Sequence, residues 1–373
     1  MRSPPCRPYR DRLRLWLLAA LALCLGGSLV SLAAADNWSD WRGPHQDGVS
    51  PDKDLPDHFS LDPSAADSNL IWKAPYGGRT TPIVQNGRVY IINAAGGESQ
   101  EKLVTQQERV MCFDADTGKV LWQHKFNVWL TDIVADRLGW TNMVGDPETG
   151  YVYVQGTQGY LFCYDKDGKI VWQHSLTEEF GRISGYGGRL TSPGLDGDLL
   201  IISMLNSSWG RDAIGGDRFL ALDKKTGEVA WWGSTDARPK NTYSSSPVFA
   251  TIHGVRQVIS GGGDGGVHGF QAHTGKRLWS YFFADGAVNA APIVQGTRVW
   301  VGHGGSNPDS TRQGRVICVD AGKVKDGKPE LVWKVDGIKD RFSTPILHDG
   351  RLYVADVTAR LFCLDADTGK TLW

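Results

Sequence analysis

A short motif that ends in tryptophan recurs six times, and this repeat is the feature that most constrains the fold. Successive motif tryptophans lie 40 to 59 residues apart. A period of this length is typical of a propeller in which each repeat forms one four-stranded blade. The copies are CFDADTGKVLW (112–122), CYDKDGKIVW (163–172), ALDKKTGEVAW (221–231), GFQAHTGKRLW (269–279), CVDAGKVKDGKPELVW (318–333) and CLDADTGKTLW (363–373).

Short alternating apolar segments precede each motif and predict further strands. One example is Thr81-Pro82-Ile83-Val84, which is followed by the apolar segment 88–92. The dipeptides Asn86-Gly87 and Asp349-Gly350 are two-residue hairpin turns that supply positive φ. Each unit is therefore predicted to contain strand A, a tight turn, strand B, a variable turn, strand C, an Asp-x-x-Thr-Gly turn and strand D.

The string DADTGK occurs twice and is predicted to be the turn between strands C and D. Its Asp can accept hydrogen bonds within the turn, and its Gly can adopt the left-handed conformation. A calcium loop of the EF-hand type needs Gly at the sixth position, whereas Gly118 and Gly369 stand at the fifth. The spacing therefore excludes that metal site.

The predicted fold class is all-β: a β-propeller of four-stranded antiparallel blades with tryptophan-docking motifs, six of which are visible. Residues 36–68 form a polar N-terminal segment, and residues 69–373 form the propeller. The segment 69–73 resembles a strand D without strands A to C before it, while the sixth copy ends at Trp373. We therefore expect part of a seven- or eight-bladed ring, with the C-terminal blade or blades missing. Alternatively, six blades close directly and residues 69–73 pair at an edge.

The six motifs resemble the tryptophan-docking motif of pyrroloquinoline quinone (PQQ)-type propellers. In that family, the tryptophan stacks between the small first residue of its own motif and the Thr-Gly peptide of the neighbouring blade. The resemblance implies docking roles for Trp122, Trp172, Trp231, Trp279, Trp333 and Trp373. The second copy lacks the Thr, the fourth has Gln271 in place of Asp, and the fifth carries an insertion, so we expect departures there. Residues 37–44 resemble the start of secreted bacterial PQQ-like repeat proteins.

Four of the six cysteines occupy one repeat position, and the other two precede residue 36. Cysteines that share a register on different blades lie far apart around a ring, so we expect no disulfide between them. They are interpreted as small apolar packing residues rather than redox or metal-binding groups.

Residues 1–35 are predicted to be a signal peptide cleaved near Ala35, because five arginines precede an apolar run and then Ala33-Ala34-Ala35. The alternative is a short membrane anchor, although the apolar run is short for a span. Leu23 before Cys24 argues against a lipid anchor. Removing this +4 segment from a chain of net charge −1 leaves −5. We therefore expect a secreted or periplasmic protein with no stable membrane insertion after cleavage and no nucleic-acid partner.

One motif suggests a nucleotide site but has another interpretation. Gly261–Gly266 contains a formal GxGxxG, yet a strand-like segment follows instead of a helix. It is therefore interpreted as the hairpin between strands B and C. No metal-ligand cluster or haem attachment sequence was found, and no catalytic residue is assigned.

Two functions remain open. The leading hypothesis is a non-catalytic binding or scaffold module that binds a protein, peptide or glycan, because the chain resembles the PQQ-like propeller of outer-membrane protein assembly, which binds partner proteins without a cofactor. The alternative is a PQQ-dependent quinoprotein dehydrogenase that oxidises an alcohol or a sugar with PQQ and calcium. The chain lacks the adjacent cysteine pair of many alcohol-oxidising members. This absence favours a protein without a cofactor, and PQQ with calcium stays open as the alternative.

The loops between strand D and the next strand A are predicted to gather at one mouth of the channel. They are rich in Arg, aromatic and amide residues, which would form a polar, partly cationic funnel for an acidic peptide, a carboxylate or a glycan. Alternatively, these side chains only cap the blades. The candidates are Arg79, Arg137, Trp140, Asn142, Arg182, Tyr186, Arg189, Asn241, Tyr243, Asn289 and Arg341.

Overall fold

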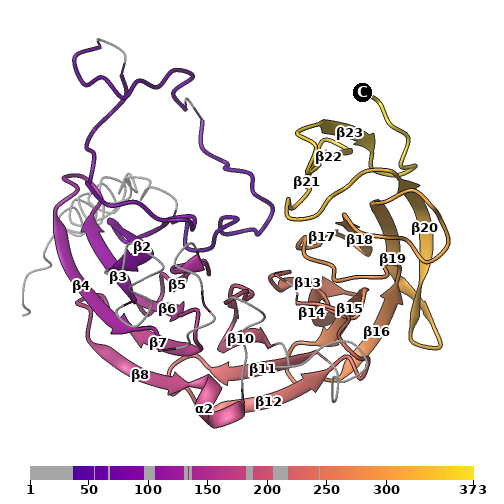
Figure 1. Ribbon diagram of the computed structural model, residues 1–373, viewed down its shortest axis with the longest axis horizontal. Helices are drawn as coiled ribbons and strands as arrows, with labels where there is room; N and C mark the ends of the chain where they lie inside the picture. The colour runs from indigo at the N-terminus through magenta and orange to yellow at the C-terminus, as the bar shows by residue number, and fades with distance from the viewer. Residues whose placement is uncertain are drawn as a thin grey trace, which may run out of the picture. The chain divides into compact units, whose positions relative to one another are not determined.

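The six motif copies lie in six antiparallel sheets, five of which have the predicted strand order A, B, C, D and the sixth only A, B, C. The computed structural model describes residues 37–53, 55–65, 68–95, 106–129, 133, 137–181, 188–204, 217–242 and 244–373. The predicted signal peptide, residues 1–35, lies outside them. Figure 1 shows the sheets following one another around a central space, with the A strands inside and the D strands outside.

We number the sheets as blades 1 to 6 in chain order. Blade 1 contains β1 (Ile83–Gln85), β2 (Arg88–Ala95), β3 (Gln107–Asp114) and β4 (Val120–Asn127). Blade 2 contains β5 (Val144–Asp146), β6 (Tyr151–Gln155), β7 (Tyr160–Tyr164) and β8 (Ile170–Ser175), which the short helix α2 (Leu176–Phe180) follows. Blade 3 contains β9 (Gly194–Asp196), β10 (Leu199–Met204), β11 (Arg218–Asp223) and β12 (Val229–Ser234).

Blade 4 contains β13 (Val248–Ile252), β14 (Val255–Gly261), β15 (Gly266–Gln271) and β16 (Arg277–Phe282). Blade 5 contains β17 (Ile293–Gln295), β18 (Arg298–His303), β19 (Arg315–Lys325) and β20 (Lys328–Asp336). Blade 6 contains β21 (Ile346–His348), β22 (Arg351–Ala355) and β23 (Leu361–Asp365). Its fourth strand is reduced to one bridge between Leu364 and Thr371. The all-β propeller prediction is confirmed.

The turns have the predicted chemistry. Asn86 and Gly87 have φ values of 51° and 72°, as a two-residue hairpin between β1 and β2 requires. In the turn between β3 and β4, the Asp114 carboxylate accepts hydrogen bonds from the backbone N–H of Thr117 at 2.9 Å and from its hydroxyl at 2.6 Å. Gly118 follows with φ of 68°. The segment Gly261–Gly266 is the predicted hairpin between β14 and β15.

The hydrophobic core consists of layers between neighbouring blades. One layer joins Ile92 of blade 1 to Val154 of blade 2, and another joins Ile259 of blade 4 to Val301 of blade 5. The four cysteines of the repeat are buried with free thiols in the C strands. Because each layer is shared by two sheets, burial holds consecutive blades together without a disulfide. No helix in the described part of the chain is long and apolar enough to cross a membrane.

The motif tryptophans dock on the next blade. The indole N–H of Trp122 donates to the Lys166 carbonyl at 2.9 Å, and its ring covers Gly168, where a Cβ atom would lie 2.6 Å from the ring. Trp231 likewise donates to the Ala272 carbonyl at 2.8 Å and covers Gly275. The missing Thr of the second copy and Gln271 of the fourth therefore do not prevent docking. The same contact is made by Trp172 on the Lys224 carbonyl and by Trp333 on the Ala366 carbonyl.

Blade 5 departs from this pattern because its insertion replaces the Thr-Gly turn. Trp279 donates instead to the Gln257 side chain of its own blade, at 2.9 Å. The inserted residues lengthen the hairpin between β19 and β20, and its tip returns to blade 4, where the Ser280 N–H donates to the Gly327 carbonyl at 2.9 Å. The hairpin thus supplies the contact between blades that the docking turn provides elsewhere.

The two ends of the repeat array differ from its middle. The segment 69–73, expected to be a strand, has no strand partner in the described residues. Its Trp72 nevertheless docks on blade 1, donating to the Ala115 carbonyl at 2.7 Å and covering Gly118. Trp373 has no following blade in this chain and is 61% exposed.

Candidate functional site

An N-terminal segment, residues 38–48, lies among the inner strands, and we call it the plug. Trp38 bridges to Val84 of β1, and the Ser39 carbonyl accepts the N–H of Gly145 in β5 at 2.7 Å. On the other side, Gln46 Oε1 accepts the N–H of Phe249 in β13 at 3.1 Å. These contacts reach blades 1, 2 and 4, so the plug crosses the channel.

Two buried ionic residues hold the plug together. Asp40 Oδ1 accepts the backbone N–H of Arg42 at 2.9 Å. The Arg42 guanidinium donates to the carbonyls of Asp47 at 2.8 Å and of Pro345, beside blade 6, at 3.3 Å. Burial raises the pKa of Asp40 to about 6 and lowers the pKa of Arg42 to about 10. Both groups are therefore held where their charged forms are costly.

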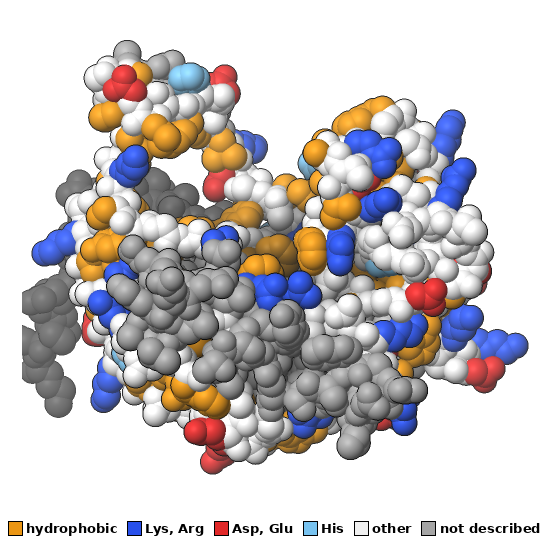
Figure 2. Space-filling model, viewed as in Figure 1, with side chains coloured by type: hydrophobic (Ala, Val, Ile, Leu, Met, Phe, Trp, Pro, Cys, Tyr) orange, Lys and Arg blue, Asp and Glu red, His pale blue; other side chains and the backbone are white. Residues whose placement is uncertain are grey.

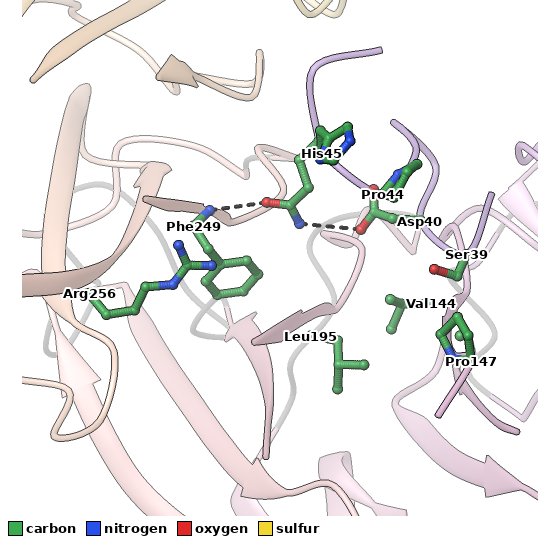
Figure 3. Close-up of a pocket in the computed structure, with 11 residues that line it drawn as sticks. Ser39, Asp40, Pro44, His45, Val144, Pro147, Leu195, Phe249 and Arg256 are labelled. Atoms are coloured by element: carbon green, nitrogen blue, oxygen red, sulfur yellow. Dashed lines mark hydrogen bonds between the residues drawn. The ribbon is translucent and has the colours of Figure 1, made fainter. Parts of the chain in front are cut away.

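The plug separates cavities at the two ends of the channel. In an antiparallel blade, the D-to-A loops and the A-to-B turns lie at opposite ends of the sheet, so we call the two ends the D–A face and the A–B face. A cavity of about 370 Å³ lies beside the A–B turns, between the plug residues 44–46 and Arg256 of β14. Figure 3 shows this cavity. The Gln46 side chain donates to Asp40 Oδ2 at 3.4 Å and accepts the Phe249 N–H at 3.1 Å. Arg256 is paired there with Asp196, at 2.9 Å from Nε to Oδ1.

Two adjoining cavities lie at the D–A face, where the funnel was predicted, and we call them the axial cavity and the lateral cavity. The axial cavity, of about 130 Å³, is lined by Trp41, Trp140, Asn142, Leu190, Ser192, Ser244, Ser246, Asn289, Ala291, Phe342 and Thr344. The lateral cavity, of about 240 Å³, is lined by Arg189, Asn241, Thr242, Gly286, Ala287, Asn289, Gly304, Gly305, Ser306, Gln313, Arg341 and Phe342. In Figure 2, Lys and Arg side chains lie beside hydrophobic ones around the hollow near the middle of the view.

The structure thus places six of the eleven predicted residues around these cavities: Trp140, Asn142, Arg189, Asn241, Asn289 and Arg341. Arg79 is exposed and Arg137 is half-buried, and neither lines a cavity described above. Arg182, Tyr186 and Tyr243 lie outside the described residues. Sequence reasoning missed the plug residue Trp41 and the polar side chains of Thr242 and Ser306.

Some of these side chains also join the blades. Asn142 Oδ1 accepts the Thr81 N–H at 2.9 Å, and Ser192 Oγ accepts the Asn142 N–H at 3.0 Å. Further around the channel, Ser246 Oγ accepts the Ser192 N–H at 3.3 Å, and Thr344 Oγ1 accepts the Ala291 N–H at 3.3 Å. Each acceptor stands two positions before the first residue of strand A. Both polar groups of the Asn142 amide are used, because its Nδ2 donates to Ser192 Oγ at 3.2 Å.

Blade 5 has Ala291 at this position, which has no side-chain acceptor. Asn289, two residues earlier, makes the hydrogen bond to the preceding blade instead, because its Oδ1 accepts the Ser244 N–H at 3.1 Å. The Nδ2 group of Asn289 makes no hydrogen bond with other described residues, so it stays available to a ligand in either cavity. Asn142 and Asn289 therefore have different roles, although both were predicted as funnel residues.

Buried carboxylates fix the loops around the mouth. Glu108 of β3 accepts the N–H groups of Gly139 at 2.7 Å and of Thr157 at 2.9 Å, which belong to blade 2. Asp217 has the same register in blade 3 and accepts the Gly263 N–H of blade 4 at 2.6 Å. Burial raises the pKa of both carboxyl groups. These acids are clasps between blades rather than ligands for a molecule in the channel.

The described residues of the mouth do not fit a calcium-bound quinone. Calcium takes six to eight oxygen ligands, which usually include carboxylates. None of the described residues lining the axial or the lateral cavity is Asp or Glu, and the amide of Asn142 is already used between blades. Within the described residues, there is also no group of three His, Cys, Asp or Glu side chains arranged to hold a metal ion.

The six repeats, the order of strands in each blade and the tryptophan docking define the class of this chain as a PQQ-like repeat β-propeller. The sequence model of the family described as "Outer membrane protein assembly factor BamB" matches residues 106–373, and the chain belongs to that family.

Individual relatives include an outer-membrane protein assembly factor and alcohol dehydrogenases. The chain is 26% identical over 316 residues to "Outer membrane protein assembly factor BamB" of Burkholderia pseudomallei (strain K96243), which is 82% of this chain and 69% of that protein. It is 24% identical over 158 residues to "Quinohemoprotein alcohol dehydrogenase ADH-IIG" of Pseudomonas putida, which is 40% of this chain and 20% of that protein. The solved "Europium-containing methanol dehydrogenase" matches with a TM-score of 0.54 at 14% identity, over 80% of this chain and 78% of that one. This structural likeness shows the fold alone.

Proposed function

We propose that this chain is a non-catalytic scaffold of the periplasm that binds a partner protein at its D–A face and acts in the assembly of outer-membrane proteins. The observation that carries the proposal is the plug, which fills the channel axis with the chain's own residues. At the D–A face it leaves the axial and lateral cavities, of about 130 and 240 Å³, while the cavity of about 370 Å³ lies at the A–B face. Small-molecule sites usually measure about 300–1,000 Å³. The mouth is therefore better suited to side chains of a macromolecular partner than to a whole cofactor.

The family supports the same proposal, because its description and the Burkholderia pseudomallei relative both refer to outer-membrane protein assembly. The location follows from the predicted signal peptide. N-terminal sequencing of the exported protein should give Asp36 or a residue close to it, whereas Met1 or a lipidated Cys24 would contradict export as a free protein.

Site-specific crosslinking tests the scaffold function in the native host. A photoreactive phenylalanine analogue replaces Phe342, which lines both D–A cavities and is 60% exposed. The matched control replaces Val255, which lies at the A–B turn of blade 4 and is 36% exposed. We expect position 342, but not position 255, to crosslink to an outer-membrane assembly protein, and deletion of the gene to lower the amount of outer-membrane proteins.

The alternative function, a PQQ-dependent dehydrogenase, is supported by the similarity to quinohemoprotein alcohol dehydrogenases of Pseudomonas putida and is tested with the purified chain. PQQ and calcium are added, and dye-linked oxidation of alcohols and sugars is followed. Turnover that depends on both additions would overturn the scaffold proposal. Unchanged outer-membrane protein amounts after deletion, with no crosslink at position 342, would overturn it as well.

A further inference from the structure

The described lining of the lateral cavity at the D–A face has a one-sided charge. Its lining includes two guanidinium groups, Arg189 and Arg341, and no described Asp or Glu. Arg341 is exposed, and its guanidinium lies 5.4 Å from the centre of the Phe342 ring. It forms no ion pair with a carboxylate among the described residues. Since the chain without residues 1–35 carries a net charge of −5, this cationic lining does not follow from the overall composition.

The remaining lining supplies a neutral hydrogen-bond donor. Asn289 turns its amide oxygen to the neighbouring blade and keeps its nitrogen available. The buried Thr242 hydroxyl accepts a hydrogen bond from the Arg189 guanidinium at 3.4 Å and donates to Asn241 Oδ1 at 3.4 Å. The loop after β18 is held by the buried His303, whose Nδ1 accepts the Gly305 N–H at 3.2 Å. A loop that is fixed in this way keeps the cavity wall in place before a ligand arrives, which lowers the ordering cost of binding.

The size of the lateral cavity limits what enters it. Its volume of about 240 Å³ corresponds to roughly eight water molecules at about 30 Å³ each. A group of that size is a side chain or a chain terminus rather than a folded element. Planar guanidinium groups bind carboxylates with two parallel hydrogen bonds, which adds geometric selectivity to the charge.

We infer that the lateral cavity is an anion site that takes a carboxylate group from the partner protein, either an Asp or Glu side chain or a free C-terminus. This inference rests on the proposed scaffold function, since it names the chemistry by which the partner is recognised. Arg341 binds the carboxylate, and the Asn289 amide nitrogen donates the neutral hydrogen bond that orients it.

Labelled peptides test the site with the purified, exported chain. Three fluorescein-labelled hexapeptides of Gly and Ser differ in two positions and in the C-terminus: two Glu with a C-terminal amide, two Gln with a C-terminal amide, and two Gln with a free carboxylate. Binding is followed by fluorescence anisotropy at 50 and 300 mM salt. We expect one or both peptides that carry a carboxylate to bind, more weakly at high salt, and the uncharged peptide not to bind. The two acidic peptides distinguish a side-chain source from a terminal source.

Variants locate the binding. R341A removes an exposed side chain, so the fold should persist, and we expect about tenfold weaker binding. R341K keeps the charge but loses the planar fork, so its affinity should lie between those of the wild type and R341A. The matched control R351A changes an exposed arginine at the A–B turn of blade 6 and should stay within about twofold. Equal binding of the Glu and Gln amides together with no effect of the free carboxylate, or no change in R341A, would overturn the inference.

The crosslinking assay at position 342 separates this inference from the proposed function. If R341A lowers both peptide affinity and crosslinking to the partner, the anion site is part of the partner interface. If R341A leaves crosslinking unchanged, the anion inference is wrong while the scaffold function stands. If no variant crosslinks at all, the scaffold function fails, although the peptide titration still measures the site.

Discussion

The contact between Trp231 and Gly275 provides the sharpest test of how these blades are held together. Trp231 is 8% exposed, and its indole donates to the Ala272 carbonyl of blade 4 at 2.8 Å. Gly275 lies under the ring with φ of 68°, and a Cβ atom there would lie 2.3 Å from Cε3 of Trp231. The change G275A therefore has two separate costs, one in the backbone and one in packing.

The two costs can be estimated and separated. A non-glycine residue in the left-handed region costs about 1–2 kcal/mol. Forcing an extra methyl group into a packed contact costs about 1–3 kcal/mol. We expect G275A to lower the free energy of unfolding by about 2–5 kcal/mol. The control G254A carries only the backbone cost of about 1–2 kcal/mol, because Gly254 has φ of 77° and a Cβ atom added there would meet no other atom within 4 Å.

A double-mutant cycle isolates the packing cost. W231A alone should cost about 3–5 kcal/mol, since it removes a buried indole. In the W231A background, G275A meets no ring, so its further cost should fall to the backbone cost of about 1–2 kcal/mol. Unfolding in urea is followed by far-ultraviolet circular dichroism, which does not depend on tryptophan emission. Equal costs for G275A and G254A in the wild-type background would refute the claim that the indole presses on the Thr-Gly turn.

Three further predictions concern the plug, the clasps and the ring. The pKa of Asp40 is about 6 in the folded chain and about 4 in the unfolded chain. Protonated Asp40 therefore contributes about 3 kcal/mol to the free energy of unfolding below pH 4, and this contribution is lost as the pH rises through 6. Urea unfolding of D40N should lack this pH dependence. E108A leaves the N–H groups of Gly139 and Thr157 without an acceptor and should cost about 2–5 kcal/mol in the same assay, whereas the control E330A, at an exposed ion pair, should stay within about 0.5 kcal/mol; equal effects would contradict the clasp. In a seven- or eight-bladed ring, the next blade would cover Trp373, which is 61% exposed here. Acrylamide should then quench the fluorescence of Trp373 more strongly in residues 37–373 than in a longer chain that contains the next blade. A closed six-bladed ring in solution would contradict this.

Local chemistry explains why the blades could be predicted. The two-residue turns and the Asp-x-x-Thr-Gly turns depend on a few adjacent residues, and Asn86-Gly87 and Asp114 behave as their sequences indicate. The insertion in the fifth copy also correctly predicted a departure there. Trp279 of blade 4 does not dock on blade 5 and donates its hydrogen bond within its own blade. By contrast, strand formation at residues 69–73 needs a neighbouring strand that the local sequence does not supply.

The plug could not be placed from the sequence because its partners are remote. Gln46 meets Phe249, which lies 203 residues away, and Arg42 meets Pro345, which lies 303 residues away. Residues 38–48 also lie outside the repeats, so an alignment of the repeats with one another does not predict where these residues lie. For the funnel, the position of each loop in the repeat predicted which loops lie at the mouth. It did not reveal that the Asn142 amide makes hydrogen bonds between blades.

The register of the D-to-A loops suggests how stability and recognition are divided among neighbouring residues. The residue two positions before strand A is Thr, Asn or Ser in five of the six blades and Ala in blade 5. In blades 2, 3, 4 and 6, its side chain accepts a hydrogen bond from the preceding blade. Two residues earlier still, the blades carry Arg79, Trp140, Leu190, Ser244, Asn289 and Phe342, which share no common chemistry. Five of these six line the axial cavity. Because the hydrogen bonds between blades are made mainly by the first position, substitutions at the second position can change the lining of the mouth while the blades stay joined.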